Sequence, residues 1–577
     1  MPWSGPVHAS TTSRATSQSS TITALGTTPM GMVDGAQDSE LRGGTSLPLN
    51  LIALIIAYIE DTGDLARVTR TSRVLYYMSL PRLYESVSLH SRSEIKYIDG
   101  RPEGFGGGSP FAMGLNGLVT RNVSNYVKHF RLWGDFRESN LEVLAKGRIP
   151  DDSMLLNVAV RAAIDQMPIL ESFSWELNSK PLKTVYQGLA ARPSLRSLKI
   201  QFPSTRMPRP TTQIPPMPNL QSLTLLDIDP LCHPDDISYL LLHSRDLISL
   251  KIHFHPRIRE NAEPSVNLDT YFGRCIAARQ PLNLKHFSFC NLYAPKTNEF
   301  NNICGDDLES LTIINSGGSA EDNPMTVFID DTWRIYDPHK HPPKIKSLRV
   351  DFVDRMFVHM LSEINPLESL YIVNARRRPG QRSNNDRHGT PVTPGQTPPE
   401  LRPNEATITA GLAGSYMNNI IQYHGSNLKH LLLSHYWSLG TEDITRLVRG
   451  CPNLTQLGMA LLEDNFNLLR ILLPFLLKIE VVRMLMNPTN PTFVQKLEAM
   501  DDRLHEMIMG CDIVGSHFDG LKWVGVGKLI FRLGKVITEK VPDENGRLVE
   551  RKRRIVKTMG PEAVKDVEIW SMDSVEP

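Results

Sequence analysis

One short pattern recurs along this 577-residue chain and constrains its fold more than any other feature. Each copy has apolar residues at its first, fourth and sixth positions, as in Leu195-Arg-Ser-Leu198-Lys-Ile200. A pattern that returns at a near-constant distance predicts a stack of similar units, which bury their apolar residues against one another. Ten clear copies begin at Leu170, Leu195, Leu220, Leu247, Leu284, Leu308, Ile345, Leu367, Leu428 and Leu454, and weaker ones at Val127, Leu476 and Leu521.

The spacing of the copies predicts the content of each unit. Five of the nine intervals between clear copies measure 24 to 27 residues, which is long enough for one strand and one helix. Along a strand, alternate side chains point to opposite faces, so the fourth and sixth positions are predicted to point inward and the third and fifth onto a concave face. Short apolar or amphipathic segments between copies are the predicted helices, at 237–243, 271–278, 356–364, 412–423 and 443–448.

This pattern resembles that of leucine-rich-repeat proteins over about residues 125–530. The resemblance implies an α/β solenoid, with parallel strands on the concave face and helices outside. Nine of the ten clear copies lack the Asn or Cys that the family usually carries at the ninth position, so we expect an irregular solenoid.

The rest of the chain divides by composition. We expect a disordered Ser/Thr-rich tail at 1–44, a Gly-rich connector at 91–124 with a loop at 100–117, and a disordered Pro- and Arg-rich insertion at 376–404. At the C-terminal end, 531–577, we expect a hairpin and a tail. Its strands are predicted at 529–541 and 548–556, with a turn at Asn545-Gly546.

Residues 45–90 form a separate helical module in this interpretation. The run from Leu51 to Ile59 is apolar nearly all round, and such a helix must be covered on more than one side. Gly63 is predicted to end this helix and Asp64 to cap a second one. A third is predicted from Ser72 to Leu80, ending before Pro81. On the residues alone, this module serves equally as a helical cap on the first repeat.

The same residues resemble an F-box, as found in F-box/leucine-rich-repeat proteins of the type abundant in filamentous fungi. The resemblance rests on the order Leu47-Pro48, Ile52, Ile55-Ile56, Asp64-Leu65, Arg67-Val68 and Pro81-Arg-Leu-Tyr84, and it departs from the family at Asn50 and in lacking a late Trp. It implies docking on the Skp-family adaptor of a cullin-RING ubiquitin ligase, with the repeats holding the substrate. The adaptor-binding residues that it implies are Leu47, Pro48, Ile52, Ile55, Leu65 and Val68.

A substrate surface is predicted on the concave face. The third position is Ser in seven of ten copies, which suits crowded parallel strands and equally a hydroxyl-lined floor for a peptide. The second, third and fifth positions carry seven Lys or Arg against three Glu, which predicts a modestly basic face for an acidic or phosphorylated substrate. The candidate substrate-binding residues are Lys199, Lys251, Lys285, Arg349, Tyr371 and Lys429.

Several classes of function are not expected. A net charge of +1 gives no reason to predict a nucleic-acid binder, and no apolar run approaches the roughly 18 residues of a spanning helix. The six cysteines have no metal-ligand spacing, and no P-loop, HExxH or GxSxG motif is present. We therefore predict a non-catalytic receptor subunit of the cytoplasm or nucleus, without cofactor or metal. The alternatives are a repeat scaffold unconnected with ubiquitination and a hydrolase hidden in the repeats.

Overall fold

The chain falls into two units, Met1–Tyr58 and Ile59–Pro577. In the first unit the described part holds one helix, α1 (Leu49–Ala57). The predicted tail at 1–44, the predicted insertion at 376–404 and the predicted turn at Asn545-Gly546 lie outside the described residues. The computed structural model describes residues 47–92, 96–98, 101–103, 109–136, 138–203, 212–229, 232–233, 235–255, 268–291, 303–304, 307–314, 344–351, 355–373, 412–435, 437–462, 473–487, 514–515, 518–542 and 548–572.

The second unit is an α/β structure built on one open, mostly parallel sheet of 17 strands. The parallel pairings follow chain order from β1 to β17, with β14 beside β15, and the antiparallel pairings β17–β18 and β18–β19 end the sheet. Its strands are β1 (Ser86–Ser91), β4 (His129–Gly134), β5 (Ser172–Leu177), β6 (Ser197–Gln201), β7 (Ser222–Ile228), β8 (Ser249–Phe254), β9 (His286–Cys290), β10 (Ser310–Ile314), β11 (Ser347–Val350), β12 (Ser369–Ile372), β13 (His430–Leu432), β14 (Ser438–Leu439), β15 (Gln456–Leu461), β16 (Val481–Leu485), β17 (Trp523–Val526), β18 (Leu529–Pro542) and β19 (Leu548–Met559). A separate two-stranded ribbon pairs β2 (Lys96–Ile98) with β3 (Arg101–Glu103).

The repeat pattern is confirmed in register. Each of the ten clear copies forms a strand that begins at its third position, and these positions pair with one another, as in Ser172↔Ser197 and Ser197↔Ser222. The same pairing joins His430 to Gln456 near the other end of the sheet. Since every unit places its apolar residues at equal heights, the fourth and sixth positions of successive strands stack into one continuous core.

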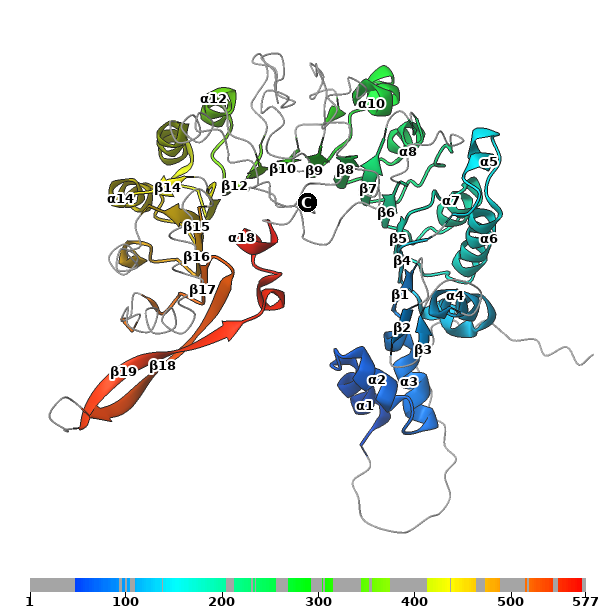
Figure 1. The fold of residues 1–577 in the computed structure, drawn as a ribbon, viewed down its shortest axis with the longest axis horizontal. Coiled ribbons are helices and arrows are strands. Elements are labelled where there is room, and N and C mark those ends of the chain that lie inside the picture. The colour runs from blue at the N-terminus through cyan, green and yellow to red at the C-terminus, as the bar shows by residue number, and fades with distance from the viewer. Residues whose placement is uncertain are drawn as a thin grey trace, which may run out of the picture. The chain divides into compact units, whose positions relative to one another are not determined.

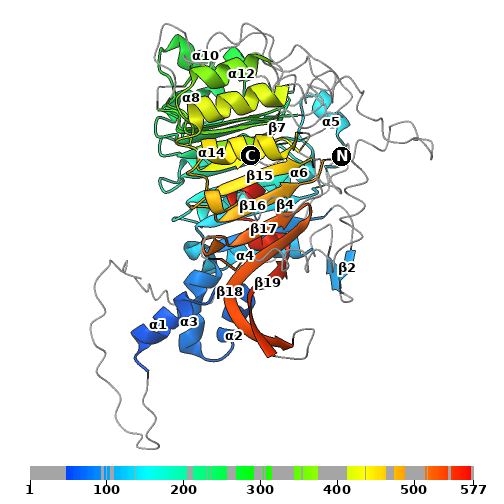
Figure 2. The ribbon, with the colours of Figure 1, turned by 90° about the vertical axis from the view of Figure 1, so that its left-hand side faces the viewer.

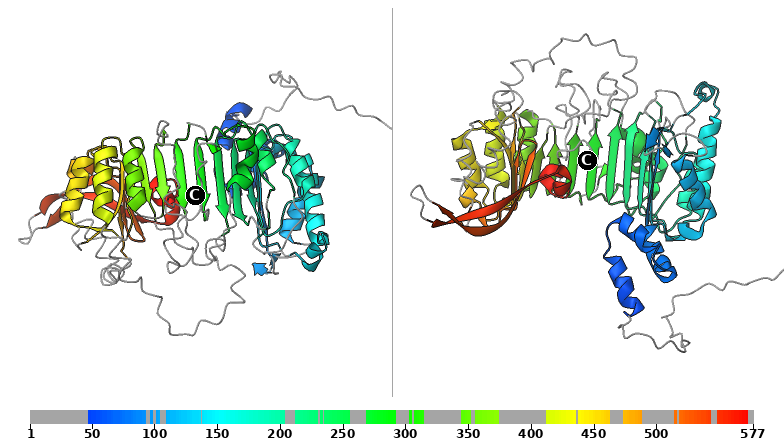
Figure 3. Two further views of the ribbon diagram at one scale, coloured as in Figure 1. Left: turned by 90° about the horizontal axis from the view of Figure 1, so that it is seen from above. Right: turned by 60° about the horizontal axis from the view of Figure 1, so that its bottom comes forward.

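Helices cover the outer, convex face of this sheet, as Figure 1 shows. The predicted helices are confirmed; the one at 412–423 consists of an α-helix over 412–419 and a π-helical turn, η4 (Ile420–His424). From the side of β15 to β17, the hairpin β18–β19 reaches beyond the parallel strands (Figure 2), and from above the strands stand side by side (Figure 3). The main outer helices are α6 (Asp151–Asp165), α7 (Lys183–Ala190), α8 (Ser238–His243), α10 (Leu268–Ala277), α12 (Arg355–Glu363) and α14 (Thr441–Gly450).

Two copies of the repeat differ from the prediction. Strand β16 begins at Val481 and pairs with Gln456, so the copy in register starts at Ile479 and not at Leu476. The pattern is loose enough to fit both registers, because Leu476, Ile479 and Val481 also satisfy it. In addition, β1 pairs in register with β4 and adds a repeat strand inside the predicted helical module.

The glycine-rich segment also differs from prediction, because α4 (Pro110–Thr120) occupies much of the predicted loop. The Ser109 hydroxyl accepts a hydrogen bond from the Ala112 amide at 3.1 Å and thereby caps the helix. Apolar residues at helical spacing, Phe111, Leu115 and Leu118, are buried. Capping and burial together outweigh the cost of about 1 kcal/mol for each glycine inside a helix.

Two short helices, α2 (Thr62–Val68) and α3 (Arg73–Leu83), precede the sheet and contact each other. Asp61 caps α2, because its carboxylate accepts a hydrogen bond from the Asp64 amide at 2.8 Å. The predicted cap, Asp64, is therefore wrong by three residues. Ser72 caps α3 as predicted. Pro81 lies inside α3 and does not stop it, since a proline removes one donor and the Tyr84 amide still reaches the Leu80 carbonyl. The other short helices are α5 (Glu142–Ala145), η1 (Asn122–Tyr126), η5 (Leu473–Phe475), η7 (Pro561–Val564) and α18 (Glu568–Ser571). Among the described residues no helix is long and apolar enough to cross a membrane.

Candidate protein-binding surfaces

Helix α1 and the two residues before it carry apolar side chains that face water. Leu47 is 49% exposed and Ile55 is 56% exposed, and Ile56 is the buried residue of the helix. Pro48 is exposed as well, and Ile52 is half-buried. Four of the predicted adaptor-binding residues thus retain accessible apolar surface, which is the property a hydrophobic docking site requires.

The other two predicted docking residues lie on α2 and differ from each other. Leu65 is only 2% exposed, so it has almost no surface to offer a partner. Val68 is half-buried. Sequence reasoning missed three exposed side chains on the neighbouring α3: Val74, Tyr76 and Tyr77. Their signal was present, because large apolar residues at consecutive helix positions cannot all face the core.

Glu176, at the end of β5, is the centre of a polar cluster on the concave face. Arg131 of β4 donates two hydrogen bonds to it at 2.8 and 2.9 Å, Lys199 of β6 donates one at 3.1 Å, and Ser174 donates another at 2.6 Å. Burial opposes ionisation, but these donors and the Lys199 charge hold the Glu176 pKa below its ordinary value. The predicted substrate residue Lys199 is therefore already paired within the sheet.

An aromatic contact lies beside this cluster. Trp133 of β4 stacks on His90 of β1, with ring centroids 3.7 Å apart, and its indole N–H donates to Ser88 at 2.9 Å. The Arg131 guanidinium lies 5.2 Å from the indole centroid. This group joins β1 and β4 across the concave face.

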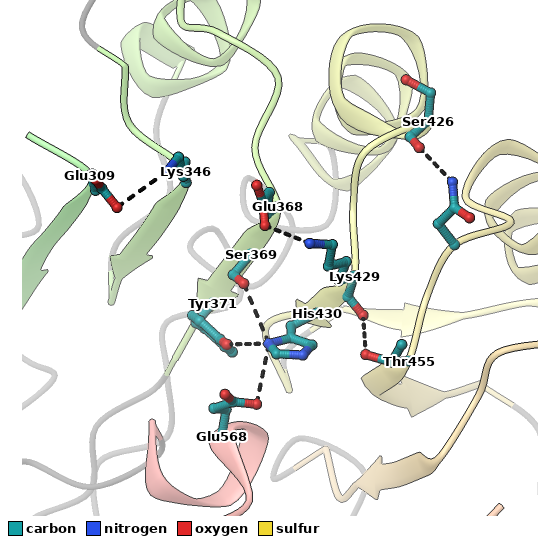
Figure 4. Close-up of polar contacts among 11 residues, drawn as sticks. Glu309, Lys346, Glu368, Ser369, Tyr371, Ser426, Lys429, His430, Thr455 and Glu568 are labelled. Atoms are coloured by element: carbon teal, nitrogen blue, oxygen red, sulfur yellow. Dashed lines mark hydrogen bonds and ion pairs between the residues drawn. The ribbon is translucent and has the colours of Figure 1, made fainter. Parts of the chain in front are cut away.

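The second positions of the repeats form a row along one edge of the sheet, and this row alternates in charge. Lys346 lies 3.2 Å from Glu309, and Lys429 lies 2.7 Å from Glu368, as Figure 4 shows. Lys285 lies 4.0 Å from Glu309. The same alternation extends to further copies, with Lys128 at 3.1 Å from Glu85 and Lys522 at 2.8 Å from Glu480. Two predicted substrate residues, Lys285 and Lys429, are thus balanced by acids, and the concave face is less basic than the sequence count predicts.

Two further predicted substrate residues are not on an open surface. Arg349 is 3% exposed and Tyr371 is 2% exposed, although both occupy fifth positions, which were predicted to face outward. From β9 to β16 the fifth position is buried, whereas in β5 to β8 it stays partly exposed. Lys251 of β8 belongs to the partly exposed group. In this half of the sheet the concave face carries a second apolar cluster.

The C-terminal segment, residues 561–572, comprises η7 and α18 and lies against part of this face. Glu568 places a carboxylate oxygen 3.3 Å from His430 Nδ1 (Figure 4). It also accepts a hydrogen bond from the Gln456 side chain at 2.6 Å. The Tyr371 hydroxyl lies 2.9 Å from the same His430 nitrogen. Burial lowers the His430 pKa, and the Glu568 charge opposes that shift.

Ile569 is the anchor of the segment. Its amide donates to the Gln456 side chain at 3.2 Å, and its carbonyl accepts from Arg483 Nη1 at 2.8 Å. Its side chain is fully buried in the second apolar cluster, which is separate from the main core. The residues of that cluster are Cys290, Ile314, Tyr371, Val373, Leu432, Val481 and Ile569.

Trp570 completes the contact. The Arg483 guanidinium lies 5.7 Å from its ring centroid, and Gly525 of β17 leaves room for the ring, because a Cβ there would lie 2.6 Å from Trp570 Cζ2. A cavity of about 350 Å³ lies between Pro561 and Trp570 of the segment and the strands behind them. Its wall is mostly apolar, and its basic groups come from His435, Arg483 and Lys528.

The sequence held one signal for this site that was not used. Three of ten clear copies carry a residue other than Ser at the third position, and two of these residues, His430 and Gln456, hold Glu568. A repeat copy that replaces the usual Ser at its third position indicates that this position contacts something different from the other copies. The replacement does not indicate that the contacting residue lies more than 100 residues further along the chain.

The described cysteines are buried free thiols. Burial raises the pKa of Cys275 to about 11 and that of Cys451 to about 12, and the thiolate is the reactive form. Within the described ranges, no group of three or more His, Cys, Asp or Glu side chains is arranged to hold a metal ion.

No protein-family model matches this sequence, and no curated protein matches it significantly.

Proposed function

We propose that this chain is the substrate-recognition subunit of a Skp-cullin-F-box ubiquitin ligase. In this proposal residues 45–90 dock a Skp-family adaptor, the repeat sheet holds the substrate, and the chain has no catalytic residues of its own. The observation that carries it is the apolar surface of α1 and of the residues just before it, with Leu47, Leu51, Leu54 and Ile55 each at least 44% exposed. Exposed apolar side chains gathered on one short helix mark an interaction site.

Hydrophobic burial would supply the docking energy, at roughly 25 cal/mol for each Å² of apolar area before the costs of association. The receptor itself acts by proximity: because it binds adaptor and substrate together, it raises the effective concentration of the substrate near the adaptor. Such a role requires a docking element and a recognition surface, and it places the chain in the cytoplasm or nucleus.

Adaptor pull-down tests this proposal. Replacing Leu47→Ala together with Pro48→Ala removes exposed apolar surface at the start of α1, so we expect capture of a Skp-family adaptor to fall at least tenfold. The matched control is Met154→Ala with Leu155→Ala on α6, which removes equally exposed apolar surface elsewhere and keeps capture at the wild-type level. Thermal unfolding of both variants checks that the repeats stay folded. Undiminished capture by the first variant contradicts the docking assignment.

A repeat scaffold without a ligase is the second candidate. It is favoured by the contact of α3 with η1 and by the position of β1, because helices that pack at the first strand also serve as an end cap for the sheet. Co-purification from cells separates the two candidates. A scaffold leaves the Skp-family adaptor behind, whereas a ligase subunit retains it.

A further inference from the structure

We infer that the concave face of β12 to β17 is a recognition site for a segment of acidic, aliphatic and aromatic residues in succession. In this inference Glu568-Ile569-Trp570 occupies the site as an internal ligand. It rests on the proposed function, because the segment that displaces the internal one would belong to a substrate. The partner is therefore a protein that presents such a segment, and the C-terminal segment competes with it.

The first argument is that the segment is held as a bound peptide is held. Gln456 and Arg483 reach the amide and carbonyl of Ile569 with their side chains, and the segment joins no strand of the sheet. Side chains that satisfy the backbone amide and carbonyl of one residue hold a bound chain at that point without depending on the side chain of that residue.

The second argument is that each of the three positions has its own selective contact. His430 and Gln456 select a carboxylate at the first position, since a ring nitrogen of His430 lies 3.3 Å from it and the Gln456 side chain donates to it at 2.6 Å. The second position lies in a fully enclosed apolar site, which suits an aliphatic side chain. The third position lies against Arg483 and over Gly525, where a flat aromatic ring fits and a Cβ on residue 525 would collide with it.

The third argument is that the segment can leave without unfolding the sheet. The main core consists of the fourth and sixth positions on the other side of the strands, and Ile569 belongs to the separate second cluster. Within α18, Ile569 is the buried residue, and Glu568 remains 45% exposed. A few contacts therefore hold the segment, and its release leaves the strands supported from behind.

Tethering explains why the site is closed in the isolated chain. A tethered ligand competes at an effective concentration in the millimolar range, so a free peptide binds the wild-type chain only weakly. Weakening the tethered ligand removes this competition, and the same free peptide should then bind more tightly.

Fluorescence anisotropy of a labelled peptide of residues 561–572, titrated with the full-length chain, tests the inference. We expect Ile569→Ala with Trp570→Ala to bind the peptide at least tenfold more tightly than wild type. Adding Gln456→Ala should reverse that gain at least tenfold, and a peptide with Glu568→Lys should not bind. Glu562→Gln, at an exposed position of the same segment, is the control and should bind like wild type. A folded double variant that binds no more tightly than wild type overturns the inference.

Glu568→Gln provides a second variant in case the double variant does not fold. It removes one charge from a partly exposed side chain, and we expect peptide binding several-fold tighter than wild type. Binding equal to wild type by this variant overturns the inference. The titration contains no adaptor, so its failure leaves adaptor docking untouched, and loss of adaptor docking leaves the titration unchanged.

Discussion

His253 lies on the concave face of β8, in the electrostatic field of the cations Lys251, Lys199 and Arg349. Burial lowers the pKa of its imidazole from 6.5 to about 3, and these three charges add to the effect. Between pH 6.5 and 3 the unfolded chain therefore binds a proton that the folded chain does not. The free energy of unfolding should therefore fall as the pH is lowered through this window, because protonation of His253 favours the unfolded chain.

His253→Gln should reduce this pH dependence. The variant keeps a neutral polar side chain but has nothing to protonate, so we expect a smaller drop in melting temperature between pH 7.5 and 5.5 than in wild type. His129→Gln, an exposed histidine on β4, is the matched control and should keep the wild-type slope. An unchanged slope in His253→Gln would show that the buried imidazole does not contribute.

Lys180 and Asp236 form a buried ion pair between the loop after β5 and the segment before α8, with side chains 4% and 2% exposed. Asp236 also accepts the Thr212 amide at 3.0 Å. Lys180→Met leaves this carboxylate buried without its cation, so we expect a loss of about 3–5 kcal/mol in the free energy of unfolding. Urea denaturation measures it. Adding Asp236→Asn should restore most of the loss, because Asn still accepts from Thr212, and no recovery would argue against the charge as the cause.

At the scale of elements, β4 shows how one glycine decides a pairing. Gly134 ends β4 opposite Ser91 of β1 with φ of +103°, and a Cβ there would lie 2.3 Å from the Ser91 carbonyl oxygen. Both the left-handed backbone and the close approach favour glycine, whereas Gly117 in α4 has neither requirement, with nothing within 4 Å of its Cβ position.

Alanine at these two positions should therefore have opposite effects. We expect Gly134→Ala to destabilise the chain by about 2 kcal/mol or more and to increase amide exchange in β1, because the end of the β1–β4 pairing must shift. Gly117→Ala should stabilise it by about 0.5–1 kcal/mol, since alanine favours the helix. Hydrogen exchange and thermal unfolding measure both, and equal effects at the two sites would contradict this account.

At the scale of the whole molecule, the number of Lys and Arg residues in the repeats does not make the concave face basic. The Lys and Arg residues of the repeats predicted a basic face, yet the second-position row alternates between acid and base, and Arg131 and Lys199 converge on Glu176. The open part of the concave face, on β4 to β8, is therefore a balanced polar surface, and the half from β9 to β16 is covered or apolar. An acidic partner is favoured locally, at His430 and Gln456, rather than by a field over the whole sheet.

The parallel sheet could be predicted from the sequence because its signal is local. Six residues specify a strand, about 25 specify a unit, and each unit packs on its neighbour, so Leu195 to Ile200 contains nearly all that is needed to place β6. The helices and the hairpin β18–β19 follow from equally local patterns. The apolar character of α1 is likewise visible in its composition, whereas its exposure is visible only in the structure.

What only the tertiary structure decided are contacts between residues far apart in the chain. Nothing near Arg349 or Tyr371 indicates their burial, and Glu568 meets Gln456 across 112 residues, a pairing that no periodicity encodes. Leu65 was assigned to docking although it packs inside, because an apolar residue has the same sequence signature in a core and in an interface. Local patterns determine which residues form strands and helices, and the free energy of burying particular surfaces together determines which of those surfaces remain open to a partner.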